Sequence, residues 1–153
     1  MTDPICPKTG APMQRGTRPV TLSYKGASLT IDMPGWYCDQ SDASAFSDQD
    51  LKFSNRALNR LKASVEGLLE PAEIRRIRKR LRMSQEQAGE LIGGSANTFN
   101  KCEAGDMLPM RAVNNVLILL DYNPSMLALL TQRGPRSARV SQNGLIAPLA
   151  GRP

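Results

Sequence analysis

The sequence predicts an α+β protein, with a small N-terminal β module followed by a C-terminal all-α domain. Residues 1–45 are rich in proline, glycine, serine and threonine, and they contain two short segments in which apolar and polar residues alternate. From residue 48 onward, apolar residues recur at the helical spacing of three and four. The length of 153 residues accommodates one ordinary domain or two small ones.

The N-terminal module is expected to contain a β-hairpin. The alternating segments 20–24 and 29–33 flank Lys25-Gly26-Ala27-Ser28, whose composition is typical of a turn. We expect Pro34-Gly35 to close the second strand and Trp36-Tyr37-Cys38 to begin another short extended piece. The aromatic pair suits either the core or a partner interface, and core packing is the commoner role.

An amphipathic helix is predicted over residues 48–66. Ser47 and Asp50 form a helix-start signal, and apolar residues follow at helical spacing at Leu51, Leu58, Leu61 and Val65. Because glycine and proline end this pattern before residue 72, we interpret residues 46–70 as a linker helix that either bridges two domains or pairs in a dimer.

Residues 71–132 are predicted to form a compact domain of five helices. The expected helices are one opened by Pro71, one opened by a Ser84–Gln87 capping box, one capped by Ser95, and two over 109–120 and 125–132. Residues 133–153 contain glycine, proline, serine and arginine, and they are expected to form a flexible tail.

Two short helices joined by Gly93-Gly94-Ser95 satisfy the requirements of a helix-turn-helix, whose second helix enters the major groove of DNA. Asn97 and Lys101 are four residues apart and share a face, while Phe99 and Cys102 are expected to be buried. Asparagine bonds adenine bidentately and lysine donates to guanine, so this face predicts base contacts. The further predicted DNA contacts are Ser95, Thr98, Asn100, Gln85 (to a phosphate, at a helix start) and Arg82.

The charge distribution also suits a polyanionic partner. Residues 52–82 carry 10 basic and 3 acidic side chains, although a solvated basic helix gives the same pattern. The chain has no histidine, which removes the commonest general base. The glycines at 89–94 lack the lysine and the preceding strand of a phosphate loop. We therefore expect a protein that is not an enzyme.

The chain is expected to be cytoplasmic. No apolar run approaches the ~18 residues that span a bilayer, and the N-terminus does not have the pattern of a secretory signal. The chain has three cysteines, and this odd number argues against a disulfide framework.

Residues 81–97, together with Phe99, Lys101, Glu103 and Gly105, resemble the XRE/lambda-repressor-like family. The segment 93–103 resembles more closely the MqsA antitoxins, in which a small zinc-binding domain precedes the DNA-binding domain. The resemblance is loose over residues 5–41 and good over 71–131. It implies that Asn97 and Lys101 read bases; the family has arginine where Lys101 stands, so the operator preference is expected to differ. Glu103 is expected to pair with an arginine.

The same resemblance implies partners. They are double-stranded operator DNA, a second copy of the chain and an RNase toxin of the MqsR kind, which is bound through residues 1–45. We therefore expect a transcriptional repressor that autoregulates a toxin–antitoxin operon. The alternative is a stand-alone XRE-family regulator without a toxin. Operator symmetry predicts a homodimer whose recognition helices lie about 34 Å apart, paired through the helix at 48–66 or the face of residues 110–130.

The resemblance implies a zinc site made by two cysteine pairs, but each pair lacks its second cysteine. The four positions are Cys6, Thr9, Cys38 and Ser41. Serine and threonine hydroxyls are poor zinc ligands, and two thiolates would need help from Asp39 or Asp42. We therefore expect no zinc and no other cofactor, with the hydroxyls hydrogen-bonded where the metal would lie. Cys6 and Cys38 are then either small buried apolar residues or a redox pair.

Overall fold

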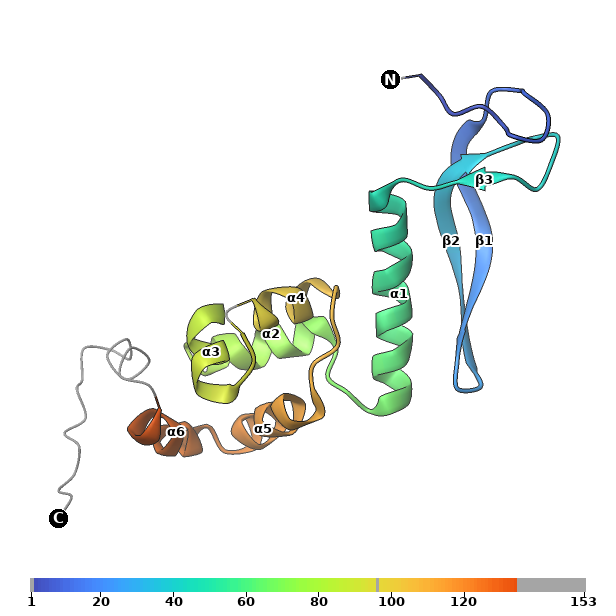
Figure 1. Cartoon of the computed structure of the whole chain (residues 1–153). Helices are drawn as coiled ribbons and strands as arrows, with labels where there is room; N and C mark the ends of the chain where they lie inside the picture. Colours follow the sequence, from blue (N-terminus) through green and yellow to red (C-terminus); the bar gives the residue numbers. More distant parts are fainter. Residues whose placement is uncertain (1, 96, 135–153) are drawn as a thin grey trace, which may run out of the picture. The chain divides into compact units, whose positions relative to one another are not determined.

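The structure, a computed structural model, describes residues 2–95 and 97–134 and confirms the α+β class (Figure 1). The chain divides into two compact units at Glu66–Gly67. The first contains a three-stranded antiparallel sheet and one helix, and the second contains five α-helices and a short 3-10 helix. The predicted flexible tail lies, from residue 135 onward, outside the described residues.

The predicted hairpin is confirmed and is longer than expected. Strands β1 (Gln14–Tyr24) and β2 (Ala27–Tyr37) pair in antiparallel register, so that only Lys25 and Gly26 connect them. Both residues have positive φ, 46° and 82°. This is the backbone of a two-residue type I′ turn, whose twist matches that of the flanking strands.

The expectation that Pro34-Gly35 closes the second strand was wrong, because β2 continues to Tyr37 and pairs there with β3 (Ser44–Ala45). Gly35 is kept in the strand by a close approach: a Cβ at this position would lie 2.7 Å from the ring of Phe46. Pro34 pairs with Thr17 of β1, but the other edge of β2 is unpaired there, because β3 pairs only at Trp36 and Tyr37; proline is found at such edge positions.

Helix α1 (Asp48–Glu66) has the predicted bounds and the predicted start. The Ser47 hydroxyl accepts a hydrogen bond from the Asp50 amide, and the Asp50 carboxylate accepts one from the Ser47 amide. The predicted apolar stripe is only partly buried, since Leu51 is 46% exposed whereas Leu58 and Leu61 are half-buried. Ala57 packs against Ile31 and Met33 of β2. The small alanine side chain lets the helix approach the sheet closely.

In the second unit the helices are α2 (Pro71–Arg80), α3 (Gln85–Ile92), α4 (Thr98–Ala104), α5 (Arg111–Tyr122) and α6 (Leu127–Arg133), with the 3-10 helix η1 (Pro124–Met126) before α6. The capping box of Ser84 and Gln87 is confirmed in both directions. The core includes Ile74, Phe99 and Leu117 from three helices. Phe99 and Cys102 of α4 are buried as predicted.

Among the described residues, no single helix is long and apolar enough to cross a membrane. Only α5 and the segment Pro124–Arg133 together reach that length and hydropathy, and this pair is bent by 118° at the break between them.

Candidate DNA-binding face and cysteine–hydroxyl site

The turn between α3 and α4 depends on two glycines with positive φ, Gly93 at 135° and Gly94 at 93°. Side chains rarely adopt this backbone region. A Cβ on Gly94 would also lie 2.4 Å from the Thr98 hydroxyl oxygen. Both conformation and space therefore require glycine here, as the helix-turn-helix interpretation predicts.

The expectation that Ser95 caps α4 was wrong, because the helix begins at Thr98 with Asn97 at the capping position. The Thr98 hydroxyl accepts a hydrogen bond from the Ser95 amide at 2.7 Å, and the Thr98 amide donates to the Ser95 carbonyl. Thr98 is buried, with 6% of its surface exposed. Its side chain therefore supports the turn, and this placement does not favour the DNA contact predicted for it.

The other predicted residues of the turn and α4 are exposed: Ser95, Asn97, Asn100 and Lys101. The Lys101 amide donates to the Asn97 carbonyl at 3.0 Å, so these residues lie one helical turn apart. The Asn97 side chain makes no capping hydrogen bond. The structure thus brings together an exposed amide and an exposed ammonium on one face, one helical turn apart.

Gln85 and Glu103 belong to a buried polar network that joins α2, α3 and α4. The Glu103 carboxylate has no exposed surface and pairs with Arg78, which is 12% exposed. The Gln85 amide donates to the same carboxylate at 2.8 Å, and Arg75 lies 3.5 Å from it. Burial alone would raise the pKa of Glu103, but the hydrogen bonds from Arg78 and Gln85 and the arginine charges outweigh it and lower that pKa. The expected arginine partner of Glu103 is thus observed.

Arg82 has a backbone conformation that the sequence did not indicate. It follows α2 with φ of 56°, in the left-handed region where glycine is usual. The Arg82 amide donates to the Lys79 carbonyl and the Met83 amide to the Arg78 carbonyl, which is the hydrogen-bond pattern of a Schellman motif. The exposed arginine side chain is therefore held just before the start of α3.

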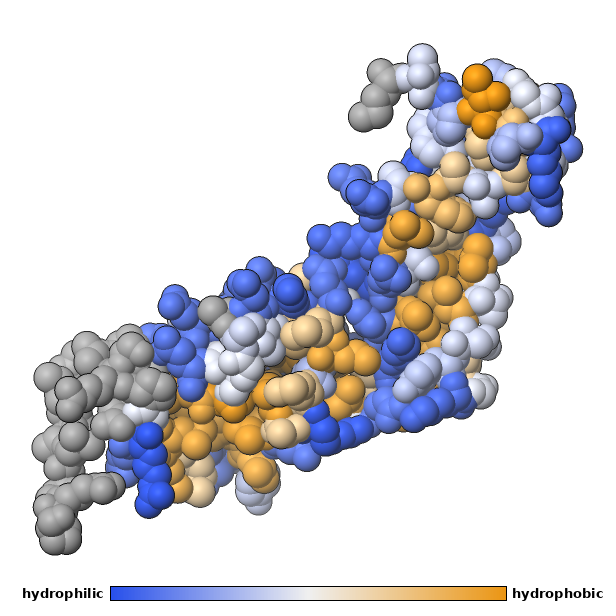
Figure 2. Space-filling model, viewed as in Figure 1, coloured by the Kyte–Doolittle hydropathy of each residue, from blue (hydrophilic) through white to orange (hydrophobic). Residues whose placement is uncertain are grey.

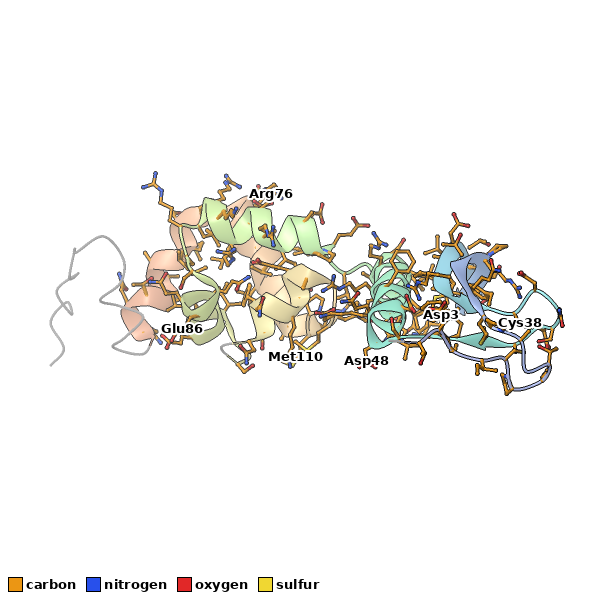
Figure 3. The ribbon with its side chains drawn as sticks, turned by 90° about the horizontal axis from the view of Figure 1, so that it is seen from above. Asp3, Cys38, Asp48, Arg76, Glu86 and Met110 are labelled. Atoms are coloured by element: carbon orange, nitrogen blue, oxygen red, sulfur yellow. The ribbon has the colours of Figure 1, made fainter. Side chains whose placement is uncertain are left out.

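Two further arginines of the basic helix α2 are engaged within the unit. Arg76 binds the Asp121 carboxylate through both terminal nitrogens, and Arg80 donates to the same carboxylate at 2.7 Å. Hydrogen bonds from Arg76 and Arg80 lower the pKa of Asp121 to about 2. Arg76, labelled in Figure 3, lies on the outer side of α2. These contacts join α2 to the end of α5.

In the first unit the side chains at the four positions of the implied zinc site lie close together, and the two hydroxyls hydrogen-bond the two sulfurs, as expected. Cys6 Sγ lies 3.3 Å from Ser41 Oγ, and Cys38 Sγ lies 3.5 Å from Thr9 Oγ1. Both thiols are buried and free of disulfide. The Cys38 carbonyl accepts a hydrogen bond from Arg18 at 2.8 Å. Cys38, labelled in Figure 3, follows directly after β2.

The donor set of this site does not fit the tetrahedral zinc centre that the family resemblance implies. Such a centre requires four thiolate, imidazole or carboxylate ligands, whereas two of the converging groups are neutral hydroxyls that hydrogen-bond the sulfurs. Within the described residues, no three cysteine, aspartate or glutamate side chains gather as a metal site. Asp42 instead pairs with Lys8 across the two loops.

The hydroxyl groups favour the ionised form of one thiol. Hydrogen bonds with Ser41 and then Thr9 lower the pKa of Cys6 to about 6, against the opposing effect of burial. By contrast, burial and the neighbouring Glu103 charge raise the pKa of Cys102 to about 11. The two cysteines therefore differ strongly in thiolate content at neutral pH.

The aromatic pair is packed within the first unit. Tyr37 is buried and donates its hydroxyl hydrogen to the Met33 carbonyl at 2.6 Å. Trp36 is half-buried against the cluster of Cys6, Met13 and Cys38. This is the commoner of the two roles considered for the pair.

Comparison with known proteins gives two matches that cover most of the chain, including both units. Residues 1–131 match the family model described as the antitoxin component of bacterial toxin–antitoxin systems, MqsA. The chain is also 26% identical over 129 residues to antitoxin MqsA from Escherichia coli (strain K12). The matched region covers 83% of this chain and 97% of that relative.

Proposed function

Because this chain belongs to the MqsA family of antitoxins, we propose that it is a DNA-binding repressor that autoregulates a toxin–antitoxin operon. The observation that carries this proposal is the exposed pair Asn97 and Lys101 on α4, beyond a turn that only glycine fits. Asparagine and lysine at this spacing suit adenine and guanine edges in one major groove. Ser95 and Asn100 flank the pair, and Arg82 is proposed to contact a phosphate. The Gln85 side chain donates to Glu103, so a phosphate there is proposed to approach the start of α3 itself.

Replacing Asn97 by alanine is expected to weaken operator binding by about 1–3 kcal/mol per recognition helix, because a bidentate base contact is lost. Binding to unrelated DNA stays nearly unchanged, since that binding depends on phosphate contacts. The measurement is a filter-binding or anisotropy titration on a fragment selected from genomic DNA by the wild-type protein. Asn55→Ala, at an exposed position of α1, is the matched control. Equal losses on operator and unrelated DNA would argue against base reading.

Replacing Arg82 by glycine is expected to separate stability from DNA binding. Glycine adopts the left-handed conformation at no steric cost, so the second unit should be unchanged or more stable by about 0.5–1 kcal/mol. A phosphate contact would be lost, so affinity should fall similarly on all sequences, with a salt slope reduced by about one. Arg82→Lys is the control that keeps the charge. Unchanged affinity for DNA in the glycine variant would remove Arg82 from the interface.

We propose that the homodimer contact lies on α5, η1 and α6, which carry several exposed large apolar side chains: Ile118, Leu119, Tyr122, Met126 and Leu129. Figure 2 shows apolar surface over α5. Leu119 is 67% exposed, which favours burial in an assembly. Leu119→Glu is therefore expected to give a monomer in light scattering, while Leu51→Glu on α1 leaves the dimer intact. The reverse result would place the contact on α1.

The first unit is proposed to bind the toxin, an RNase of the MqsR kind, through residues 1–45, and to keep its fold without zinc. A stand-alone XRE-family regulator is the second candidate, and the absence of a small basic open reading frame beside the gene would favour it. In either role the protein is proposed not to be an enzyme, and a cytoplasmic location stays a prediction.

A further inference from the structure

Cys6 and Cys38 meet although they lie 32 positions apart in the chain. Each sulfur hydrogen-bonds a hydroxyl of the other loop, Cys6 to Ser41 and Cys38 to Thr9. Cys6 and Cys38 also belong to one buried cluster, together with Met13. The hydroxyl cross-bonds thus hold two thiols from separate loops in one buried cluster.

The covering over this pair is thin. Cys6 and Cys38 are 1% and 0% exposed, but residues 7–10 and 39–40 in the two loops are all exposed. A small opening of either loop therefore brings solvent to the sulfurs. Cys102 lies in the apolar core of the second unit, between helices.

The two thiols also have the chemical character of an attacking and a resolving cysteine. Hydroxyl hydrogen bonds stabilise the Cys6 thiolate, which is the form that attacks an oxidant. Cys38 is the nearby thiol that can complete a disulfide. Cys102 is held as the neutral thiol by burial, so it reacts slowly and serves as an internal reference.

We propose that Cys6 and Cys38 form a reversible, peroxide-responsive disulfide that links the two loops of the first unit. The Cys6 thiolate attacks one oxygen of a hydroperoxide; the O–O bond breaks, and the leaving oxygen takes a proton as water or alcohol. The Cys38 sulfur then attacks the Cys6 sulfenic acid, the S–O bond breaks and a second water leaves. The two thiols are oxidised by two electrons, and the peroxide is reduced by two. A dithiol reductant restores both thiols by exchange.

The test treats the full-length protein with hydrogen peroxide and follows it by intact mass and peptide mapping. The expected result is the loss of two hydrogen atoms, a Cys6–Cys38 linked peptide and full recovery with dithiothreitol. The closed loop should also raise the thermal midpoint of the first unit, read by Trp36 fluorescence. Oxidation of Cys102 before Cys6, or sulfinic acid at Cys6 without a linked peptide, would overturn the proposal.

Two variants distinguish the roles of the pair. In Cys38→Ser, oxidation should stop at a Cys6 sulfenic acid that dimedone labels. In Ser41→Ala, which leaves both cysteines, the loss of the hydroxyl should slow alkylation of Cys6 several-fold at pH 7 without altering that of Cys102. Equal rates of Cys6 alkylation in Ser41→Ala and wild type would contradict the assigned activation of Cys6. The linked peptide in wild type tests the disulfide independently of how either variant folds.

Discussion

Replacing Thr9 and Ser41 together by cysteine is expected to convert the first unit into a stoichiometric zinc protein. Both hydroxyls already approach the sulfurs of Cys38 and Cys6, at 3.5 and 3.3 Å. The double variant therefore places four thiols around one point. Four thiolates form one of the usual tetrahedral zinc sites, and structural zinc in zinc-finger peptides contributes about 10–16 kcal/mol of binding free energy at pH 7. The expected change is from far less than one zinc per chain in the wild type to one.

Elemental analysis of purified protein, before and after dialysis against a chelator, measures this change. Thr9→Val with Ser41→Ala is the matched control, because it removes the hydroxyls without adding ligands and should bind no zinc. Bound zinc should also protect the four thiols of the double variant from peroxide. A wild-type protein that holds one chelator-resistant zinc would refute the interpretation of Thr9 and Ser41, whatever the double variant does.

The sequence allowed correct prediction of elements whose cause is local. The Lys25-Gly26 turn, the reciprocal bonds of Ser47 with Asp50 and the capping box at Ser84 all involve residues within three positions of each other. Such signals are complete within a short window of the chain. The same holds for the glycine turn before α4.

The predictions that were wrong involved competition that a local pattern does not reveal. Ser95 has the residue type of a helix cap, but the Thr98 hydroxyl binds the Ser95 amide and the helix begins three residues later. On α1 the helix itself was predicted correctly, but Ala57, the small residue that packs against the sheet, was not part of the predicted apolar stripe. The spacing of apolar residues indicates which side of a helix can be buried, but the surface that packs against the helix determines which side is buried.

Contacts between distant positions were beyond sequence analysis. The Arg15 guanidinium binds the buried Asp50 carboxylate across 35 positions, and hydrogen bonds from Arg15 and Ser47 keep the pKa of Asp50 well below its usual range. Asn114, buried in α5, accepts a hydrogen bond from the Leu69 amide at 2.8 Å. In neither pair does the spacing along the chain indicate that the two residues are in contact. Glu103 was an exception, because an arginine partner was expected for it in preference to a DNA contact, and Arg78 is that partner.

Replacing Glu103 by alanine is expected to lower the free energy of unfolding of the second unit by about 3 kcal/mol. The substitution leaves Arg78, which is 12% exposed, without its carboxylate, and an uncompensated buried charge typically costs about 3–5 kcal/mol. We expect the lower end because Arg78 retains some solvent and its hydrogen bond to the Met83 carbonyl. Total stabilities are about 5–15 kcal/mol, so this loss is a large fraction.

The two units offer separate signals in a urea titration. Trp36, the single tryptophan, lies in the first unit, so its fluorescence reports that unit alone. Far-UV circular dichroism is dominated by helices, most of which lie in the second unit. Glu103→Ala should shift the dichroism transition and leave the Trp36 transition in place. Equal shifts of both would mean that Glu103 does not act through its own unit.

The origin of the loss is tested by removing both charges. If an unpaired arginine causes the instability, Arg78→Met combined with Glu103→Leu should recover most of it, because apolar residues of similar volume often replace a buried ion pair without cost. The pH dependence gives a second reading. The folded-state pKa of Glu103 is lowered, so its stabilisation is complete above its unfolded pKa and is lost as pH falls through the folded value. That acid-sensitive part of the stability should be absent from the double variant. If the double variant is as unstable as Glu103→Ala, then packing around the side chain, and not charge compensation, holds α2 and α4 together.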